Sequence, residues 1–598
     1  MLRHIAALWG IKNTDTLDPL VKLLVEALAG ELKKTHNEIQ TFEKRILEKI
    51  ALLLTPGVLS FPYPAHAICK ALPTESIHTI DRKTQLQIIS KAIAGQDKPL
   101  TLHFTPAGPV RIFNAEITNM ATDNKFFSIA SSGHKTPLFH LSTNNTHSKN
   151  IWLGLKISPD IKQLNGLNFF IDFKNTDARS ALLQMIHSAS WYIHHLPVKI
   201  THGLSYEYSV QKQNIISDYE PLTVIENEVT HLYNDHFVTI DSLDTSLPLA
   251  QLTEEIPAEL ATYAEAVSTE NKLLWFRLEL PGYVDDRVIN DLQITCNSFP
   301  IINRKLVDKA HRLKGITNII PIHTDTGAFF LSVEQLSDSE GRTYTQTPFM
   351  TDEEKDTGTY AVRHGGTERP DTRNAKEYLV YLMDLIRDES AAFSSYGQET
   401  ISSMVKELDR ILAQLEQRLR KNPAWHEDSS HYVTVGYRKN QEAFFMQYWI
   451  TNSTYANGIN AGTPLNLYMG SELRNGSIEL LTSTTGGKKA LEPSRHIDAY
   501  KYAMLSHNKI ITAEDIKAFC YYELGDLIDM VTVRKGLTLS KKPGEGLIRC
   551  IEVRLRKHRK NISNQETAIQ WENMLANLKT KMELRSSLNL NFEIKLEE

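Results

Sequence analysis

A seven-residue apolar repeat near the start of the chain constrains its fold more than any other feature. Asp18 and Pro19 predict the start of a helix, because aspartate caps the free N–H groups of the first turn and proline is tolerated at the first helical position. Apolar side chains then recur at heptad spacing: Val25, Leu28, Leu32, Ile39, Phe42 and Ile46. One helix cannot bury such a stripe alone. The sequence therefore predicts a long N-terminal helix that packs against either the body of the protein or another subunit.

A second helical segment is predicted over residues 371–425, where Pro423 ends the pattern. Its latter half places apolar residues at alternating steps of three and four: Ile401, Met404, Leu408, Ile411 and Leu415. Charged residues fill the outer face, as is typical of an amphipathic helix. Ordinary core packing and a coiled coil with another chain both fit this second stripe.

Short predicted strands dominate the region between the two helical segments, because stretches rich in β-branched and aromatic residues are separated there by turn residues. These strands cover residues 101–104, 151–157, 169–173, 273–280, 292–295, 318–323 and 328–333, with one helix over 180–195. The stretch 347–369 is dense in Asp, Glu, Thr and Gly and is predicted to be an exposed loop. Further on, Asn457-Gly458 and Asn475-Gly476 predict type I′ hairpin turns.

The C-terminal part carries the clearest local signals. Thr512 with Asp515 predicts the capped start of a helix, which Gly525 ends. Strands are predicted over 527–535 and 548–557, followed by a helix that Ser563 and Glu566 cap and that reaches Arg585, and by a strand over 588–596. The order helix, strand, strand, helix, strand predicts a small α+β domain of the split-βαβ type.

The length of 598 residues predicts several domains. We expect an α+β multidomain protein with a long N-terminal helix, β-rich central domains, a second long helical segment and a small C-terminal α+β domain. The expected boundaries enclose an N-terminal helical segment (1–60), a β-rich domain with a helix (61–245), a second β-rich domain (246–370), the helical segment (371–425), a β-hairpin region (426–510) and the C-terminal domain (511–598).

Motifs that carry chemistry are missing from the sequence. The loop around Gly487-Lys488 lacks the flanking residues of a phosphate-binding loop, and neither Gly-x-Ser-x-Gly nor His-Glu-x-x-His occurs. His231 and His236 flank Asp235, but their spacing is poor helical geometry for a shared metal. The four separated cysteines are expected to be buried apolar residues. We therefore expect no catalytic residue, no metal and no cofactor.

Charge and hydropathy restrict the classes of binding partner and the cellular compartment that we expect for this protein. The formal net charge of −5 argues against a dedicated nucleic-acid-binding protein. Apolar runs are too short to span a membrane and no signal peptide is recognisable, so we expect a cytoplasmic protein without membrane insertion. The basic run 554–560 fits binding of phosphates or of an acidic protein face. A charged edge strand that resists strand addition is the favoured interpretation of this run.

A resemblance covers most of the chain. Residues 6–10 (Ala-Ala-Leu-Trp-Gly), 18–21 and 52–56 resemble the N-terminal region of the TssF family. Residues 276–281, 297–304, 319–321 and 338–344 are similar to the central block of that family, and 512–516 resemble the assembly domain that phage baseplate proteins share. The tyrosine-rich lead that usually precedes the first helix is missing, so contacts made by that lead cannot be carried over to this chain. Divergence elsewhere in the sequence indicates an outlying branch of the family, such as the Bacteroidetes type.

The resemblance implies a structural baseplate wedge subunit of a contractile type VI secretion system. Its implied partners are a TssG-type subunit, a second copy of the chain, TssK-type adaptors, a TssE-type protein and the VgrG-type spike hub. The baseplate would lie at the cytoplasmic face of the inner membrane, the heptad stripe would enter an interprotein helix bundle, and the C-terminal assembly domain would join neighbouring wedges. Ile39→Asp is then expected to abolish co-purification with the TssG-type partner.

Two other functions fit the sequence less well. A phage-tail baseplate protein would share the fold and serve a virion. A carbohydrate-active or carbohydrate-binding protein would account for the 7 Trp and 22 Tyr residues. Glycoside hydrolysis needs two carboxylates across a cleft, and no such pair is recognisable on the predicted strands.

Overall fold

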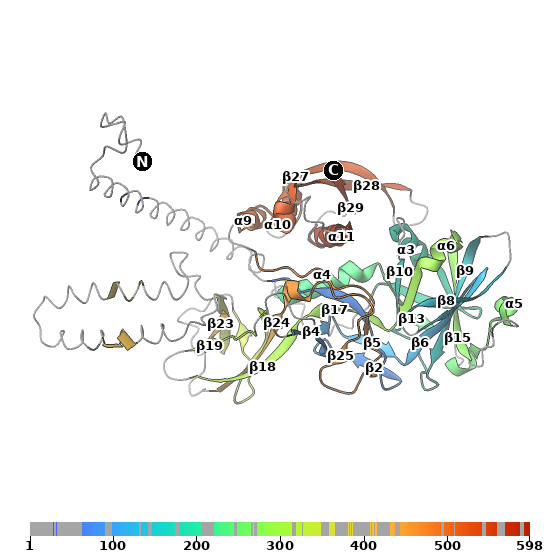
Figure 1. Ribbon diagram of the computed structural model, residues 1–598, viewed down its shortest axis with the longest axis horizontal. Coiled ribbons are helices and arrows are strands. Elements are labelled where there is room, and N and C mark those ends of the chain that lie inside the picture. Colours follow the sequence, from blue (N-terminus) through green and yellow to red (C-terminus); the bar gives the residue numbers. More distant parts are fainter. Residues whose placement is uncertain are drawn as a thin grey trace, which may run out of the picture. The chain divides into compact units, whose positions relative to one another are not determined.

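The computed structural model of the chain is a mixed α+β protein that is rich in strands (Figure 1). It describes residues 62–89, 99–130, 133–141, 146–173, 179–204, 221–243, 248–264, 267, 272–313, 318–325, 327–347, 358–364, 431–436, 443–491, 496–506, 509–540, 546–558, 568–586 and 591–597, with single helical positions within 28–32, 381–386 and 407–414. Two compact units divide the chain. The smaller contains Met1–Leu54, His311–His323 and Ser337–Phe444, and the larger contains the remainder.

The largest described sheet lies in the larger unit, and its strand pairs are antiparallel. Its order is β16 (Leu292–Cys296), β10 (Asn168–Phe173), β13 (Phe237–Leu243), β12 (Leu196–His202), β11 (Ser190–Ile193), β15 (Leu273–Asp285), β9 (His147–Ile157), β6 (Ala115–Thr122), β7 (Lys125–Ile129) and β8 (Lys135–His140), with β14 (Thr253–Glu254) on β15. Consecutive apolar residues bury the central strands on both faces. The predicted domains 61–245 and 246–370 thus both contribute strands to one sheet.

Short helices lie between these strands. They are α3 (Arg179–His187), α4 (Pro221–Asn234), η4 (Leu249–Gln251), η5 (Ala258–Leu260), α5 (Ala261–Ala264) and α6 (Asp286–Asp291). The helix predicted over 180–195 is wrong after His187, because α3 ends there and residues 190–193 form β11. Trp191 and Ile193 of β11 are buried opposite β15, so pairing with that strand decides the conformation of this segment.

A second sheet in the larger unit combines distant parts of the sequence. Its antiparallel order is β25 (Asn466–Leu467), β3 (Leu86–Ile89), β4 (Thr101–Pro106), β17 (Ser298–Asn303), β1 (His66–Lys70) and β26 (Glu479–Leu480), and β2 (Ile77–Ile80) pairs with β5 (Val110–Phe113) nearby. Phe104, Ile301 and Leu480 lie in its core.

The prediction of type I′ turns at Asn457-Gly458 and Asn475-Gly476 is wrong. Type I′ requires positive φ at both central residues, yet Asn457, which follows η7 (Ser453–Ala456), has φ −76°. Only the glycines reach positive φ, +79° at Gly458 and +77° at Gly476. An extended residue before a positive-φ glycine is the type II pattern, which any residue tolerates at the first position.

Further strands complete the β-rich part. One three-stranded sheet has the order β18 (Lys305–Arg312), β24 (Ala443–Thr451) and β20 (Phe329–Asp338). In the smaller unit, β19 (Ile319–Pro321), β23 (His431–Gly436), β22 (Thr359–His364) and β21 (Thr345–Gln346) form another. The loop predicted over 347–369 is therefore wrong at β22, because Tyr360 and Ala361 are buried by pairing with β23. Residues 348–357 and 365–369 lie outside the described residues.

The C-terminal part of the larger unit forms a compact α+β domain. After α9 (His496–Ser506) come α10 (Ala513–Leu524), η9 (Gly525–Leu527), β27 (Ile528–Leu539), β28 (Leu547–Lys557), α11 (Ala568–Arg585) and β29 (Asn591–Glu597). β28 pairs antiparallel with β27 and parallel with β29. The predicted capping box is confirmed, since the Thr512 hydroxyl accepts from the Asp515 N–H and the Asp515 carboxylate accepts from the Thr512 N–H. Gly525 ends α10 at φ +51°, as expected.

The N-terminal helical stripe lies almost entirely outside the described residues. Leu28 and Leu32 are helical, but the long N-terminal helix as a whole is not supported by the part of the chain that the structure describes. In the segment 371–425, only single helical positions such as Met383, Arg410 and Ile411 are described. The domain boundaries drawn at these segments remain predictions.

Candidate functional site

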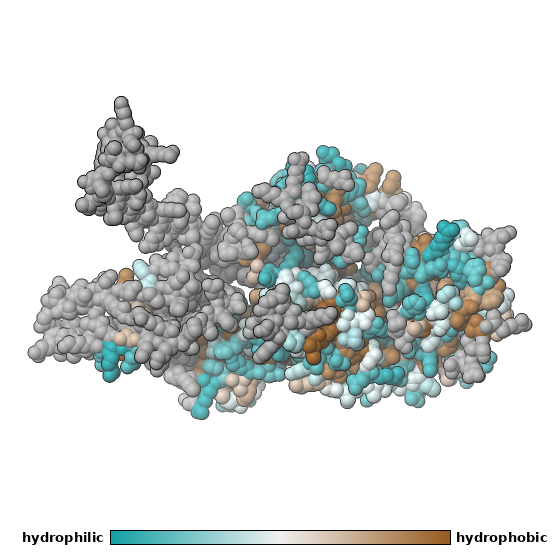
Figure 2. Space-filling model, in the orientation of Figure 1, coloured by the Kyte–Doolittle hydropathy of each residue, from teal (hydrophilic) through white to brown (hydrophobic). Residues whose placement is uncertain are grey.

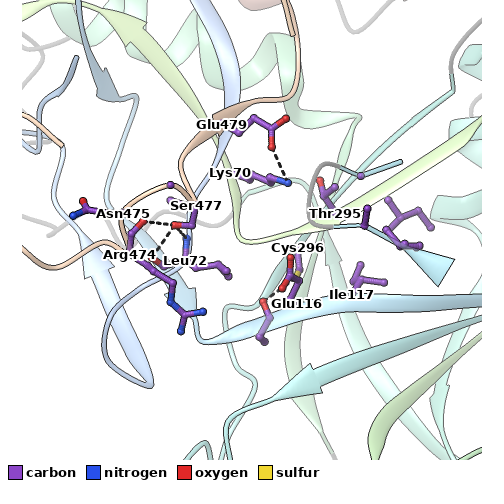
Figure 3. Close-up of a pocket in the computed structure, with 17 residues that line it drawn as sticks. Lys70, Leu72, Glu116, Ile117, Thr295, Cys296, Arg474, Asn475, Ser477 and Glu479 are labelled. Carbon is purple, nitrogen blue, oxygen red and sulfur yellow. Dashed lines mark hydrogen bonds and ion pairs between the residues drawn. The ribbon is translucent and has the colours of Figure 1, made fainter. Parts of the chain in front are cut away.

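A cleft of about 440 Å³ lies in the larger unit (Figure 3). Its walls are formed by the end of β1 with residues 71–72, the start of β6, the end of β7 with residues 130 and 133, the end of β16 and the loop 474–479. These segments are far apart in the sequence, so only the tertiary structure brings them together. Two carboxylates, Glu116 and Glu479, are among the lining groups.

Several polar groups of the cleft are engaged with one another. Lys70 Nζ lies 3.2 Å from a carboxylate oxygen of Glu479, and this ion pair cross-links the adjacent strands β1 and β26. The Ser477 hydroxyl accepts from the Leu72 N–H at 3.1 Å and donates to the Arg474 carbonyl at 2.6 Å. Figure 3 shows these contacts between the loop and the end of β1. They hold the loop 474–479 in place, which is a structural task.

The one thiol in the cleft is not a nucleophile. Burial raises the pKa of Cys296 to about 12, and its Sγ donates to the Ala115 carbonyl at 3.3 Å. Only the thiolate attacks electrophiles, and at neutral pH this thiol stays protonated. All four cysteines are buried, as the sequence predicts.

A cluster of buried charges joins the C-terminal domain to the rest of the larger unit. We call this cluster the ionic junction and define it as Tyr63, Glu228, Lys488, Glu523, Lys581 and Arg585. Glu228, from α4, lies 2.5 Å from Arg585 Nη2 and 3.8 Å from Lys581 Nζ, both of α11. Glu523, from α10, lies 2.6 Å from Lys488 Nζ and 3.0 Å from Lys581 Nζ. The Tyr63 hydroxyl donates to Glu228 at 2.9 Å.

The charges of the ionic junction compensate one another. Burial by itself would raise the pKa of Glu523, but Lys488 and Lys581 hold that pKa well below its usual range. Burial would lower the pKa of Arg585, whereas Glu228 raises it. Both side chains therefore stay ionised at any physiological pH, and each depends on its partners. The apolar core of the C-terminal domain and the core around α4 share no residue, and the ionic junction connects these two separate cores.

A second buried ionic cluster lies inside the larger unit. The Arg304 guanidinium is fully buried, lies 2.6 Å from Glu226 and stacks 4.5 Å from the ring centre of Trp449. Arg82 connects Glu226 to Glu334. Burial would raise the pKa of Glu334, but the Trp449 N–H and Arg82 lower it to about 2. Arg304 lies in the segment 297–304 that carries the resemblance, and its burial indicates a structural role there.

The basic run 554–560 does not form a sheet edge, so the favoured interpretation of it is wrong. β28 is the middle strand, because β29 arrives from later in the sequence and pairs beside it. Arg554 lies 2.6 Å from Glu552 and 3.4 Å from Glu597 of β29. These carboxylates compensate the charge of Arg554. Positions 559–560 lie outside the described residues.

The histidines that flank Asp235 contact different partners. His231 lies 3.9 Å from Glu583, whereas His236 lies 3.7 Å from Asp172. Among the described residues, no group of three or more His, Cys, Asp or Glu side chains is arranged to hold a metal ion. Within the same residues, no helix is both long and apolar enough to cross a bilayer.

The structure describes three of the predicted interface residues. Leu28 and Leu32 lie on a helix and are 53% and 52% exposed, and Ile411 is helical and 48% exposed. Leu28 and Leu32 are one turn apart, so they share a helix face. The other predicted residues lie outside the described part of the chain: Val25, Ile39, Phe42, Ile46, Ile401, Met404, Leu408 and Leu415.

Sequence reasoning missed the ionic junction, including the part of Lys488 in it. Gly487 allows the loop that carries Lys488 to approach another backbone segment closely, because a Cβ there would lie 2.4 Å from the Ser453 carbonyl oxygen. The partners Glu228, Glu523 and Lys581 have ordinary neighbours in the sequence. No local signal marks them.

Comparison with known proteins identifies part of the chain. The family model "Type VI secretion system, TssF" matches residues 3–196. No curated protein sequence matches the chain. The fold is similar to a chain of the cryo-electron microscopy structure of the TssK-TssF-TssG baseplate subcomplex, with TM-score 0.44, 12% identity and coverage of 96% of both chains.

A chain of the type VI secretion baseplate complex is also similar, with TM-score 0.35, 10% identity and coverage of 99% of this chain and 92% of that chain. The family match in the N-terminal part agrees with the resemblance seen in residues 6–10, 18–21 and 52–56. Residues 3–196 of the chain therefore match the family model of TssF proteins of type VI secretion systems.

Proposed function

We propose that this chain works as a mechanical scaffold in the baseplate wedge and that its stable partner is a TssG-type subunit. The observation that carries the proposal is the TssF family match over residues 3–196. The described structure is compatible with a scaffold, because its buried charges are used in cross-links such as the ionic junction. Such cross-links keep domains in fixed positions, which a subunit that transmits force requires.

We place the partner contact on the N-terminal apolar stripe. Leu28 and Leu32 support this placement, because each leaves about half of its side chain exposed on one helix face. Covering that surface is favourable, since buried apolar area contributes about 25 cal/mol per Å². The remaining stripe residues, Val25, Ile39, Phe42 and Ile46, continue the same seam by sequence.

The further partners follow from the family. A second copy of the chain, a TssK-type adaptor, a TssE-type protein and a VgrG-type hub would complete the assembly, at the cytoplasmic face of the inner membrane. The chain itself would catalyse no reaction in it. In the described part of the chain, the one cleft thiol is protonated and Glu479 is paired with Lys70.

Co-expression with the neighbouring TssG-type and TssK-type genes tests the proposal. We expect a complex of defined mass by sizing and native mass spectrometry. Leu28→Asp combined with Leu32→Asp should weaken it roughly 100-fold, because two apolar contacts are lost and two charges are buried. Met469→Asp is the matched control, since Met469 is an exposed apolar residue of a loop in the other unit.

A stable lone monomer with hydrolase activity on a polysaccharide would overturn the proposal. If the folded double variant forms the complex at full strength, the proposed contact surface is wrong. A partner set of capsid and tail proteins in place of the TssG-type subunit would favour the phage-tail alternative.

A further inference from the structure

The sheet of the C-terminal domain extends beyond the helices that cover it. Val531 and Val533 of β27 share one face with Leu555 and Val553, which lie opposite them on β28. These residues pack in one core with Phe519 of α10 and Leu578 of α11. The helices α10 and α11 therefore cover this face of the sheet at the start of β27 and the end of β28.

Farther along the hairpin, the same face is uncovered. Because successive side chains of a strand point to opposite faces, the residues on this face continue with Lys535 and Leu537 on β27 and with Arg549 and Leu547 on β28. Leu537 and Leu547 are each 65% exposed. Figure 2 shows brown, hydrophobic surface at this end of the hairpin, next to teal surface. Leucines on the helix-covered face of a sheet are expected to be buried, so their exposure marks a surface without its cover.

The charged side chains beside these leucines on the same face are basic. Lys535 and Arg549 are exposed, and within the described residues neither forms an ion pair with a carboxylate. The opposite face of the same sheet differs, because Arg554 and Lys595 there lie within 4 Å of Glu552. On the uncovered face leucines and basic side chains are thus interleaved, since Arg549 lies directly opposite Leu537 and Lys535 is two residues before Leu537.

We propose that an acidic amphipathic helix of a partner subunit docks on this face and continues the layer that α10 and α11 begin. Its apolar stripe would contact Leu537 and Leu547, and its carboxylates would pair with Lys535 and Arg549. A helix fits because the free surface is a sheet face, and helices already cover the adjoining part of that face. Charge complementarity then selects an acidic helix. The inference rests on the proposed function, which supplies the partner subunits.

Photo-crosslinking in cells that carry the complete apparatus tests the inference. Leu537 is replaced by p-benzoylphenylalanine in the full chain, and Met530 is replaced in the control. Met530 lies on the same strand, is 45% exposed and faces the opposite side of the sheet. We expect position 537 to crosslink to an acidic helical segment of another subunit, at least tenfold more strongly than position 530.

Charge reversal provides the second arm. Lys535→Glu with Arg549→Glu should lower the crosslink from position 537 at least tenfold. Arg556→Glu, an exposed cation on the opposite face of β28, should change it less than twofold. Equal labelling at positions 530 and 537, or crosslinks to a non-acidic segment, to a second copy of this sheet, to lipid or to nucleic acid, would overturn the inference.

The two proposals fail separately in this design. If the TssG-type subunit co-purifies while position 537 captures no partner helix, this inference is wrong and the proposed function stands. If no subunit co-purifies with the unsubstituted chain, the proposed function fails and this inference fails with it. Thermal melting of each variant, unchanged from the parent chain, shows that a lost crosslink does not come from unfolding.

Discussion

Removing one carboxylate from the ionic junction should loosen the C-terminal domain. Glu228→Gln keeps the shape of the side chain and an acceptor for the Tyr63 hydroxyl, but removes the charge that lies 2.5 Å from Arg585 and 3.8 Å from Lys581. Glu228 is 4% exposed, so water cannot replace the lost carboxylate. Deleting one partner of a buried ion pair costs about 3–5 kcal/mol, and we expect a loss in this range.

Urea denaturation of the full chain measures the loss in free energy of unfolding, and hydrogen exchange locates it. We expect the amides of α10 and α11 to exchange faster in Glu228→Gln than in the parent chain. Glu514→Gln is the matched control, because the Glu514–Lys517 pair has a 2.8 Å contact but Glu514 is 71% exposed. Exposed pairs contribute about 0–1 kcal/mol. A loss for Glu228→Gln no larger than that of the control would refute the argument that burial makes this junction strong.

Two further predictions concern His66 and Gly487. His66 is buried, its Nδ1 lies 2.9 Å from the Tyr233 hydroxyl, and burial with the nearby charge of Lys581 lowers its pKa to about 3. The unfolded chain binds this proton near pH 6.5, so stability should fall as pH drops from 6.5 towards 3, by about 1.4 kcal/mol per pH unit, and His66→Asn should flatten that slope in urea titrations. Gly487→Ala should cost about 1–3 kcal/mol in the same assay, because its Cβ would meet the Ser453 carbonyl, whereas Gly282→Ala, with 3.7 Å of clearance, should change stability little.

The sequence determined the local elements of the C-terminal domain. The capping box of Thr512, the end of α10 at Gly525 and the alternating strands near 528–539 and 547–557 were all predicted close to their observed positions. Helix caps and strand alternation act over a few residues, so they are readable without knowing the fold. The resemblance in residues 6–10, 18–21 and 52–56 was also readable, and the family match over residues 3–196 agrees with it.

Local signals failed where pairing with a distant strand decided the conformation. The segment 190–193 was predicted as helix and forms β11, because Trp191 and Ile193 fit a buried strand beside β15. The polar composition around β22 predicted a loop, but pairing with β23 makes it a strand. The basic run on β28 was assigned to a sheet edge, and β29 turns β28 into the middle strand.

Only the tertiary structure decided which charges meet. Tyr63 and Glu228 are 165 residues apart, and Lys488 reaches Glu523 from a loop that had no predicted role. Coulombic attraction carries no directional or sequence-spacing rule, so any of the 66 basic residues is a partner in principle for any of the 71 acidic ones. The fold selects the ionic junction by burying particular pairs, and burial is a property of three-dimensional packing that no single stretch of sequence contains.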